Sequence, residues 1–221
     1  MVYQQTKQGH YCSMSNNTMN TPTEKTIEEL IENWELFLKV VSTKVENEAL
    51  KTSLLNLCEG QKDRILICPA STRTDFIAAK PGGLVWHSLN VLKLAKDLNK
   101  VYATNISADD LVVASLFHDI GKIGDQYDDL YLKQESSWHR ERGMMFELNP
   151  KLNTSNVPQR SLWWLNHYKV PLNLDIINAI TSVHLETPDF SATHVTYNVP
   201  TISLILQQAT RASCVINKGK F

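Results

Sequence analysis

Apolar residues recur every three or four positions along most of this chain, and this helical period constrains the fold more than any other feature. From Thr23 onward the repeat runs through Ile27, Leu30, Ile31, Trp34, Leu38 and Val41. The same period predicts further helices over residues 47–58, 84–99, 107–118, 158–168, 172–185 and 200–216. Strong strand-like alternation is absent from the sequence, and residues 195–199 are the one weak candidate. The predicted fold class is therefore all-α.

Helix-breaking residues separate these helices. Residues 69–83 are predicted to form a loop because a Pro-Gly-Gly run interrupts any regular element there. Residues 124–137 are polar, aromatic and irregular, whereas residues 141–148 are predicted to form a short helix that ends at an Asn-Pro pair. Ser107 is a suitable N-cap for the helix that follows it, because its hydroxyl can accept from a free backbone N–H.

Length and composition indicate one globular domain preceded by a flexible arm. Residues 1–23 are rich in Ser, Asn, Thr and Gln, and they offer too little apolar surface to offset the entropy of ordering. The hydrophobic fraction of 43% and the charged fraction of 20% are ordinary for a globular protein. We therefore expect a flexible N-terminal arm over residues 1–23 and a single helical domain over residues 24–221.

Charge and cysteine content restrict the cellular compartment and the classes of binding partner that we expect for the protein. The net charge is −1 and the sequence contains no basic block. It therefore gives no indication of an extended surface that binds nucleic acid or a membrane. There is no signal peptide and no run of 18 apolar residues, and we expect a cytoplasmic protein that does not enter a membrane. Cys12, Cys58, Cys68 and Cys214 are far apart, which is typical of reduced thiols.

Three predicted helices each place one histidine on the apolar face: His87, His118 and His184. Asp119 follows His118 at the predicted end of its helix, just before Gly121, where the backbone can turn and bring imidazole and carboxylate together. Each buried imidazole needs a polar partner, and a shared metal ion would satisfy several at once. The alternative is a helical bundle in which these histidines are incidental core residues.

Two motifs carry a family resemblance. Residues 81–91 read Pro-Gly-Gly-Leu-Val-Trp-His-Ser-Leu-Asn-Val, and residues 114–122 read Ala-Ser-Leu-Phe-His-Asp-Ile-Gly-Lys. Over residues 69–212 the chain resembles the HD-domain metal-dependent phosphohydrolases, in particular the small single-domain type of bacteria and bacteriophages. The resemblance implies an HD-domain helical bundle that holds one or two divalent metal ions, in the cytoplasm of a bacterium or of an infected host cell.

The resemblance assigns roles to particular residues of this chain. It implies that His87, His118 and Asp119 are metal ligands, and we expect their side chains to converge from two different helices. It implies that Asp119 also orients or deprotonates a water molecule, and that Lys122 is catalytic through its hold on a phosphate oxygen. His184 falls near a family histidine that binds substrate or a second metal. His139 and Arg160 fall in segments that edge the substrate pocket.

The chain also departs from the family pattern. Thr210 follows Ala209 in the last predicted helix, where the family has an aspartate that completes the metal site. Ile77 and Val157 stand at positions where relatives often have histidines. A hydroxyl is neutral near pH 7 and attracts a dication weakly, so we expect weak binding of the divalent metal, which could be Mn, Mg, Zn, Fe, Co or Ni.

These features predict a metal-dependent phosphohydrolase that acts on a nucleotide or a related small phosphoester. The near-neutral charge favours a small substrate over a long polymer. One alternative is a catalytically decayed HD-fold protein that binds a nucleotide or a protein partner without hydrolysis. A less favoured alternative is an exonuclease for single-stranded ends, with stacking by Trp138, Trp163, Trp164 and Tyr168. The sequence leaves the oligomeric state open.

Overall fold

The computed structural model describes residues 24–185 and 199–218 of the chain. Most of these residues are helical, so the predicted all-α class is confirmed. The helices are α1 (Glu24–Lys44), α2 (Glu48–Gly60), α3 (Lys62–Ile67), α4 (Gly83–Val101), α5 (Ala108–Phe117), the 3₁₀ helix η1 (Ile120–Ile123), α6 (Ser137–Glu141), α7 (Val157–His167), α8 (Leu174–Ser182) and α9 (Thr201–Ile216). The strands are β1 (Tyr131–Lys133) and β2 (Phe146–Leu148).

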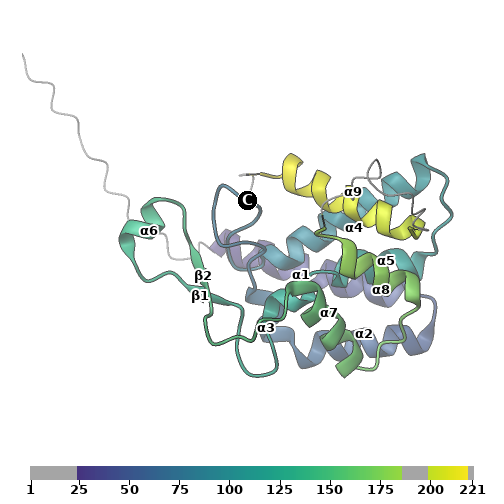
Figure 1. The fold of residues 1–221 in the computed structure, drawn as a ribbon, viewed down its shortest axis with the longest axis horizontal. Helices are drawn as coiled ribbons and strands as arrows, with labels where there is room; N and C mark the ends of the chain where they lie inside the picture. The colour runs from purple at the N-terminus through teal and green to yellow at the C-terminus, as the bar shows by residue number, and fades with distance from the viewer. Residues whose placement is uncertain (1–23, 186–198, 219–221) are drawn as a thin grey trace, which may run out of the picture.

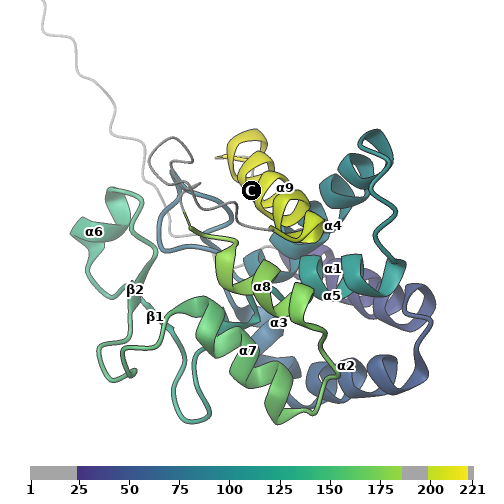
Figure 2. The same cartoon turned by 45° about the vertical axis from the view of Figure 1, so that its right-hand side comes forward.

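The long helices form one bundle with α4 and α5 in its interior (Figures 1 and 2). Helix α1 packs against α2, α4 and α5, and α9 packs against α4, α5 and α8. Aromatic rings fill the space between α1 and α5: Phe37 is stacked on Trp34 at 5.8 Å and meets Phe117 edge-on at 5.4 Å. Phe117 is fully buried and directly precedes His118, so the end of α5 is anchored in the core.

Side-chain caps explain where several helices begin. Asn47 accepts from the backbone N–H of Leu50 at the start of α2, and the predicted cap Ser107 accepts from the N–H of Asp110. Asn156 and Gln159 form a reciprocal capping box at the start of α7. Each cap satisfies one of the backbone donors that a first helical turn leaves unpaired. These local interactions place the helix starts close to their predicted positions.

The prediction of a helix over residues 141–148 was wrong. Residues 146–148 form β2, which pairs antiparallel with β1, and α6 lies between the two strands at Ser137–Glu141. The start of β2 also has a partner that is remote in sequence, since the backbone N–H groups of Met145 and Phe146 both donate to the carbonyl of Thr72. Strands of three residues have too few positions to show a period, so the helical spacing misled the prediction. Residues 195–198 of the weak strand candidate lie outside the described residues.

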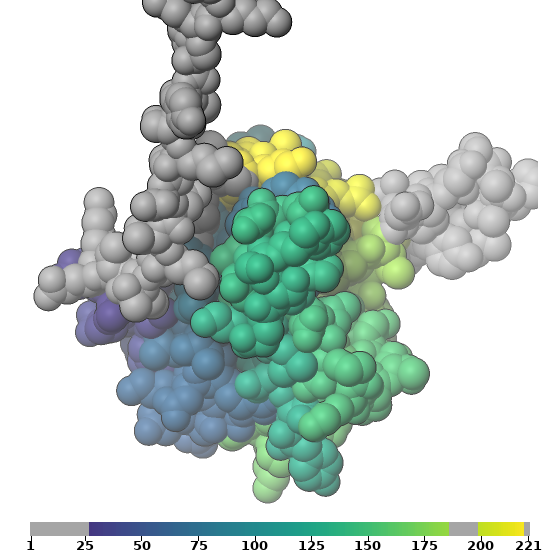
Figure 3. Space-filling view, turned by 90° about the vertical axis from the view of Figure 1, so that its left-hand side faces the viewer, coloured from purple at the N-terminus to yellow at the C-terminus, as the bar shows by residue number. Residues whose placement is uncertain are grey.

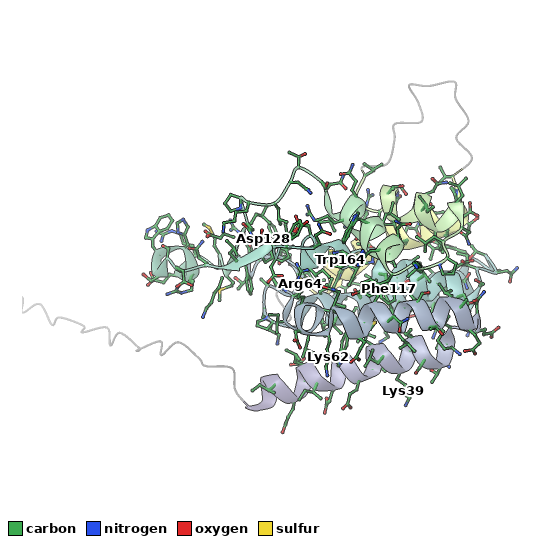
Figure 4. All side chains as sticks on the ribbon, turned by 90° about the horizontal axis from the view of Figure 1, so that it is seen from below. Lys39, Lys62, Arg64, Phe117, Asp128 and Trp164 are labelled. Carbon is green, nitrogen blue, oxygen red and sulfur yellow. The ribbon has the colours of Figure 1, made fainter. Side chains whose placement is uncertain are left out.

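The segment that carries the hairpin projects from the bundle toward the viewer in Figure 3. Arg64 of α3 anchors the chain before β1: its guanidinium pairs with Asp129 at 2.7 Å and donates to the carbonyl of Asp128 at 3.0 Å. The same guanidinium lies 5.5 Å from the ring of Trp164, and the three labelled residues Arg64, Asp128 and Trp164 can be followed in Figure 4. The base of the hairpin is thus held against both α3 and α7.

Replacing Tyr131 by Phe should make the protein more resistant to alkaline unfolding. Burial raises the pKa of Tyr131 to about 12, against the opposing effect of the Lys122 ammonium. In an unfolded chain the pKa of this phenol is about 10. The neutral phenol therefore contributes its full stabilisation below pH 10, and this contribution is lost as the pH rises through about 12. Between these values the wild type should lose up to about 1.4 kcal/mol per pH unit relative to the variant.

Urea unfolding at pH 8 and pH 11 measures this difference. Tyr127→Phe is the matched control, because Tyr127 is 83% exposed and its replacement should leave the pH dependence unchanged. A Tyr131→Phe variant with the same pH dependence as the wild type would show that the hairpin is not packed against the bundle in solution.

Two further sequence predictions concern membranes and cysteines. Within residues 24–185 and 199–218, no helix combines the length and the apolar character needed to cross a membrane. Cys58, Cys68 and Cys214 are free thiols, and burial raises the pKa of Cys58 to about 12. The predicted arm over residues 1–23, including Cys12, lies outside the described residues.

Candidate metal centre

His87, His118 and Asp119 converge from two helices, as predicted. One ligand atom from each residue lies within 4.8 Å of the others, and all three side chains are buried. Helix α4 supplies His87, whereas α5 ends at Phe117 and its C-cap His118 is followed by Asp119 in the turn that leads into η1. Since α4 and α5 pack along each other, the helix end and the α4 histidine meet in the bundle interior.

The hydrogen bonds of His118 leave one ring nitrogen ready to bind a cation. Its Nδ1 lies 3.0 Å from the carbonyl of Ser115, and because a carbonyl only accepts, Nδ1 must donate. In the neutral ring Nε2 then carries the lone pair, and this buried atom has no hydrogen-bond partner among the described residues. A histidine held through Nδ1 to a carbonyl is the usual arrangement of a metal ligand.

His87 has a similar arrangement. Its Nδ1 is hydrogen-bonded to Ser213 Oγ of α9 at 3.2 Å, and its Nε2 lies 3.9 Å from Asp119 Oδ2. The corresponding distance from His118 Nε2 is 3.5 Å. An ion about 2.0–2.2 Å from each ligand atom allows these separations. The donor set of two imidazoles and a carboxylate suits a zinc-like or harder transition metal, so the residues present fit a divalent ion.

Asp119 is the most heavily contacted residue of the centre. Its Oδ2 is paired with Lys122 Nζ at 2.7 Å, and its Oδ1 is 2.7 Å from His184 Nε2. Lys122 Nζ also donates to the carbonyl of Ala70 at 2.8 Å. His184 follows α8 and its side chain is 42% exposed, whereas that of Asp119 is fully buried. His184 therefore marks the side from which a ligand can approach.

The electrostatics of the centre favour the protonation states that metal binding requires. Burial raises the pKa of Asp119, but the Lys122 ammonium, His118 and His184 outweigh it and hold the pKa well below its usual value. Burial lowers the pKa of His87 and of His118, although the Asp119 carboxylate opposes this. Asp119 is thus ionised and both imidazoles are neutral near pH 7, which are the forms that bind metal. For Lys122, Asp119 outweighs burial and the pKa is raised, so the ammonium keeps its charge.

Two residues predicted to edge the pocket lie apart from this cluster. Arg160 is buried in α7, where its Nε donates to the carbonyl of Gly121 at 3.1 Å and its Nη1 donates to that of Ser155. His139 belongs to α6, at the outer end of the hairpin and away from α5 and α8 in Figures 1 and 2, and its ring packs on Trp138 at 4.9 Å. The structure therefore places Arg160 against the turn after Asp119, and His139 on the projecting segment.

Thr210 lies on the face of α9 that reaches His87. It stands three residues before Ser213, so the two side chains share one face of the helix. Thr210 is 4% exposed, and its Oγ1 has no hydrogen-bond partner among the described residues. Of the other two departures, Ile77 packs in a small apolar cluster with Ala70 and Ala78, and Val157 begins α7. Thr210 therefore presents a buried hydroxyl on the same side of α9 as Ser213, the residue that contacts His87.

Several groups that support the centre were not predicted from the sequence. Ser213 could have been found, because it follows Thr210 by one turn on the same predicted helix. The carbonyl of Ala70 carried no signal, since any residue provides one. Ser161 was not predicted to have a role, yet its hydroxyl contacts the backbone on both sides of Asp119.

Comparison with known proteins agrees with this geometry. Residues 85–189 match the HD domain family. This range contains His87, His118, Asp119, Lys122 and His184, and it ends before Thr210. No curated protein and no solved structure matches the chain significantly. The family match and the buried cluster of two histidines and an aspartate together assign residues 85–189 of the chain to the HD domain family.

Proposed function

We propose that this protein is a metal-dependent phosphohydrolase that acts on a nucleotide or a related small phosphoester. The observation that carries this proposal is the convergence of His87, His118 and Asp119, with the Nε2 of His118 buried and unpaired among the described residues. When bound there, a divalent ion supplies an activated water molecule and neutralises charge on the phosphoryl oxygens.

Asp119, Lys122 and His184 form a connected set around the proposed reaction centre. Asp119 holds the imidazole of His184 through Oδ1 and the ammonium of Lys122 through Oδ2, so it orients both groups. We assign to Lys122 the stabilisation of negative charge on the phosphoryl group. We also assign to His184, which is partly exposed and held by a carboxylate, contact with the substrate and proton exchange with it.

A small pocket lies beside Lys122, but none of His87, His118, Asp119 and His184 lines it. Its volume is about 200 Å³, and Cys68, Lys122, Tyr131 and Phe146 contribute to its walls. Its walls also include Arg64, Lys133 and Asp129, so the pocket combines both signs of charge with aromatic surface. The preference for a small substrate stays a prediction. Of the tryptophans considered for stacking on a polymer, Trp164 is buried in the core and cannot take part, whereas Trp138 and Trp163 are exposed. Substrate contacts by His139 and Arg160 stay predictions.

Hydrolysis assays on metal-loaded protein test the proposal. After removal of metal with a chelator, addition of Mn²⁺, Co²⁺ or Zn²⁺ should restore phosphate release from one or more members of a panel of nucleoside phosphates and from bis(p-nitrophenyl) phosphate. His118→Asn should lower that rate at least ~100-fold, because it removes a metal ligand. His167→Asn is the matched control, since His167 is stacked on Trp163 in α7 and should leave the rate unchanged.

Two other results would contradict the proposal. Nucleotide binding that Mn²⁺ strengthens, without product from any substrate, would favour the binding protein without hydrolysis. Loss of activity in His167→Asn as large as in His118→Asn would show that the measured rate does not arise at this centre.

A further inference from the structure

The turn that carries Asp119 is short and depends on outside contacts for its geometry. After Phe117 the chain passes through His118 and Asp119 into the 3₁₀ helix η1, in which Lys122 N–H donates to the carbonyl of Asp119 at 2.9 Å. A single 3₁₀ turn has poorer hydrogen-bond geometry than an α-helix and is weak by itself. What packs against the turn therefore determines where the Asp119 carboxylate points.

Ser161 of α7 bonds to the backbone on both sides of Asp119. Its Oγ donates to the carbonyl of His118 at 2.7 Å and accepts from the N–H of Gly121 at 2.8 Å. These directions are unambiguous, because a carbonyl only accepts and a backbone N–H only donates. Ser161 is 0% exposed, so water does not compete for either bond. One hydroxyl thus closes a bridge across residues 118–121.

The absence of a side chain at Gly121 makes this bridge feasible. A Cβ on Gly121 would lie 2.3 Å from the carbonyl oxygen of Val157 and 2.6 Å from the backbone nitrogen of Ser161, and neither backbone atom can move aside. Glycine therefore lets the first turns of α7 approach the turn closely enough for the Ser161 hydroxyl to reach it. Two neighbours strengthen the contact: Arg160 Nε donates to the carbonyl of Gly121, and Trp164 Nε1 donates to that of Gly124.

We propose that Ser161 is a positioning residue for Asp119, one that fixes the backbone on both sides of this carboxylate and thereby the distances among Asp119, His87 and His118. This inference rests on the proposed metal-dependent function and adds a residue that touches neither metal nor substrate. A residue that orients a ligand without binding the ion typically changes metal affinity 10–100-fold. Ser161 acts through the main chain, so its effect should extend to both His118 and Asp119.

The test compares Ser161→Ala with Ser203→Ala in the full chain. Ser203 is a matched control because it is also buried, at 1% exposure, while its hydroxyl has no hydrogen-bond partner among the described residues. Titration of metal-free protein with Co²⁺, at a temperature where circular dichroism shows all variants folded, gives the affinity and the visible spectrum of the site. Ser161→Ala should bind Co²⁺ at least ~10-fold more weakly, with an altered spectrum, and Ser203→Ala should match the wild type.

A second readout does not depend on metal. Hydrogen exchange of the Gly121 amide in metal-free protein should be faster in Ser161→Ala than in the wild type, because its acceptor is lost. Unchanged Co²⁺ affinity and spectrum in Ser161→Ala overturn the proposal, even if the thermal midpoint falls, since packing alone would then explain the residue. If the wild type binds no Co²⁺, the proposed function fails, and the exchange rate alone decides whether Ser161 holds the turn.

Discussion

Asp119→Asn should abolish binding of the divalent ion and hydrolysis, and it should also lower the free energy of unfolding by roughly 3 kcal/mol. Asparagine keeps the shape of the side chain but removes the charge that a dication requires. The loss of stability follows from the ion pair, because Lys122 Nζ lies 2.7 Å from Asp119 Oδ2 and both side chains are largely buried. Removing one member leaves an ammonium without a counter-ion in the bundle interior.

The double variant Asp119→Asn/Lys122→Met separates the two effects. It removes both buried charges together, so most of the lost stability should return, while metal binding and hydrolysis stay absent. Urea unfolding measures the first quantity, and metal analysis with the hydrolysis assay measures the second. Hydrolysis retained by Asp119→Asn would place the reaction at a different centre.

Thr210→Asp should raise the affinity for Mn²⁺ by about tenfold or more, which corresponds to about 1.4 kcal/mol. Thr210 lies on the face of α9 that reaches His87, and its hydroxyl has no hydrogen-bond partner among the described residues. A carboxylate at this position adds a full negative charge close to the ion. Without metal, the same charge is buried among apolar groups, so the metal-free variant should be less stable than the wild type.

Thermal unfolding over a series of Mn²⁺ concentrations measures this affinity, because a ligand that binds the folded state alone raises the apparent stability. Thr210→Asn is the matched control: it offers a carbonyl oxygen at the same reach as Asp but carries no charge. If the Asp and Asn variants bind Mn²⁺ equally well, residue 210 lies outside the reach of the ion. Tight Mn²⁺ binding by the wild type would show that a hydroxyl suffices here.

The candidate centre could be predicted to the level of its three principal side chains. His87, His118 and Asp119 carried a signal because each lies at a definite place in a helical pattern, on an apolar face or at a helix end. The groups that contact these three side chains carried almost no signal in the sequence. The phosphate role predicted for Lys122 stays a prediction, and nothing in the sequence indicated that its ammonium bridges Asp119 and the carbonyl of Ala70, which is 52 residues earlier in the chain.

The sequence by itself determined the longer helices of this protein (α1, α2, α4, α5, α7, α8 and α9), because the helical period and the caps Asn47, Ser107 and Asn156 act within one or two turns. The shorter helices α3 and α6 were not predicted. The sequence also determined that an imidazole and a carboxylate would stand together at the end of α5. Only the tertiary structure decided the hairpin, since strands of three residues are defined by their pairing partner and by a carbonyl at Thr72. It likewise decided which groups position Asp119, because a hydrogen bond such as that from Ser161 to His118 depends on how α7 packs against the turn rather than on any local pattern.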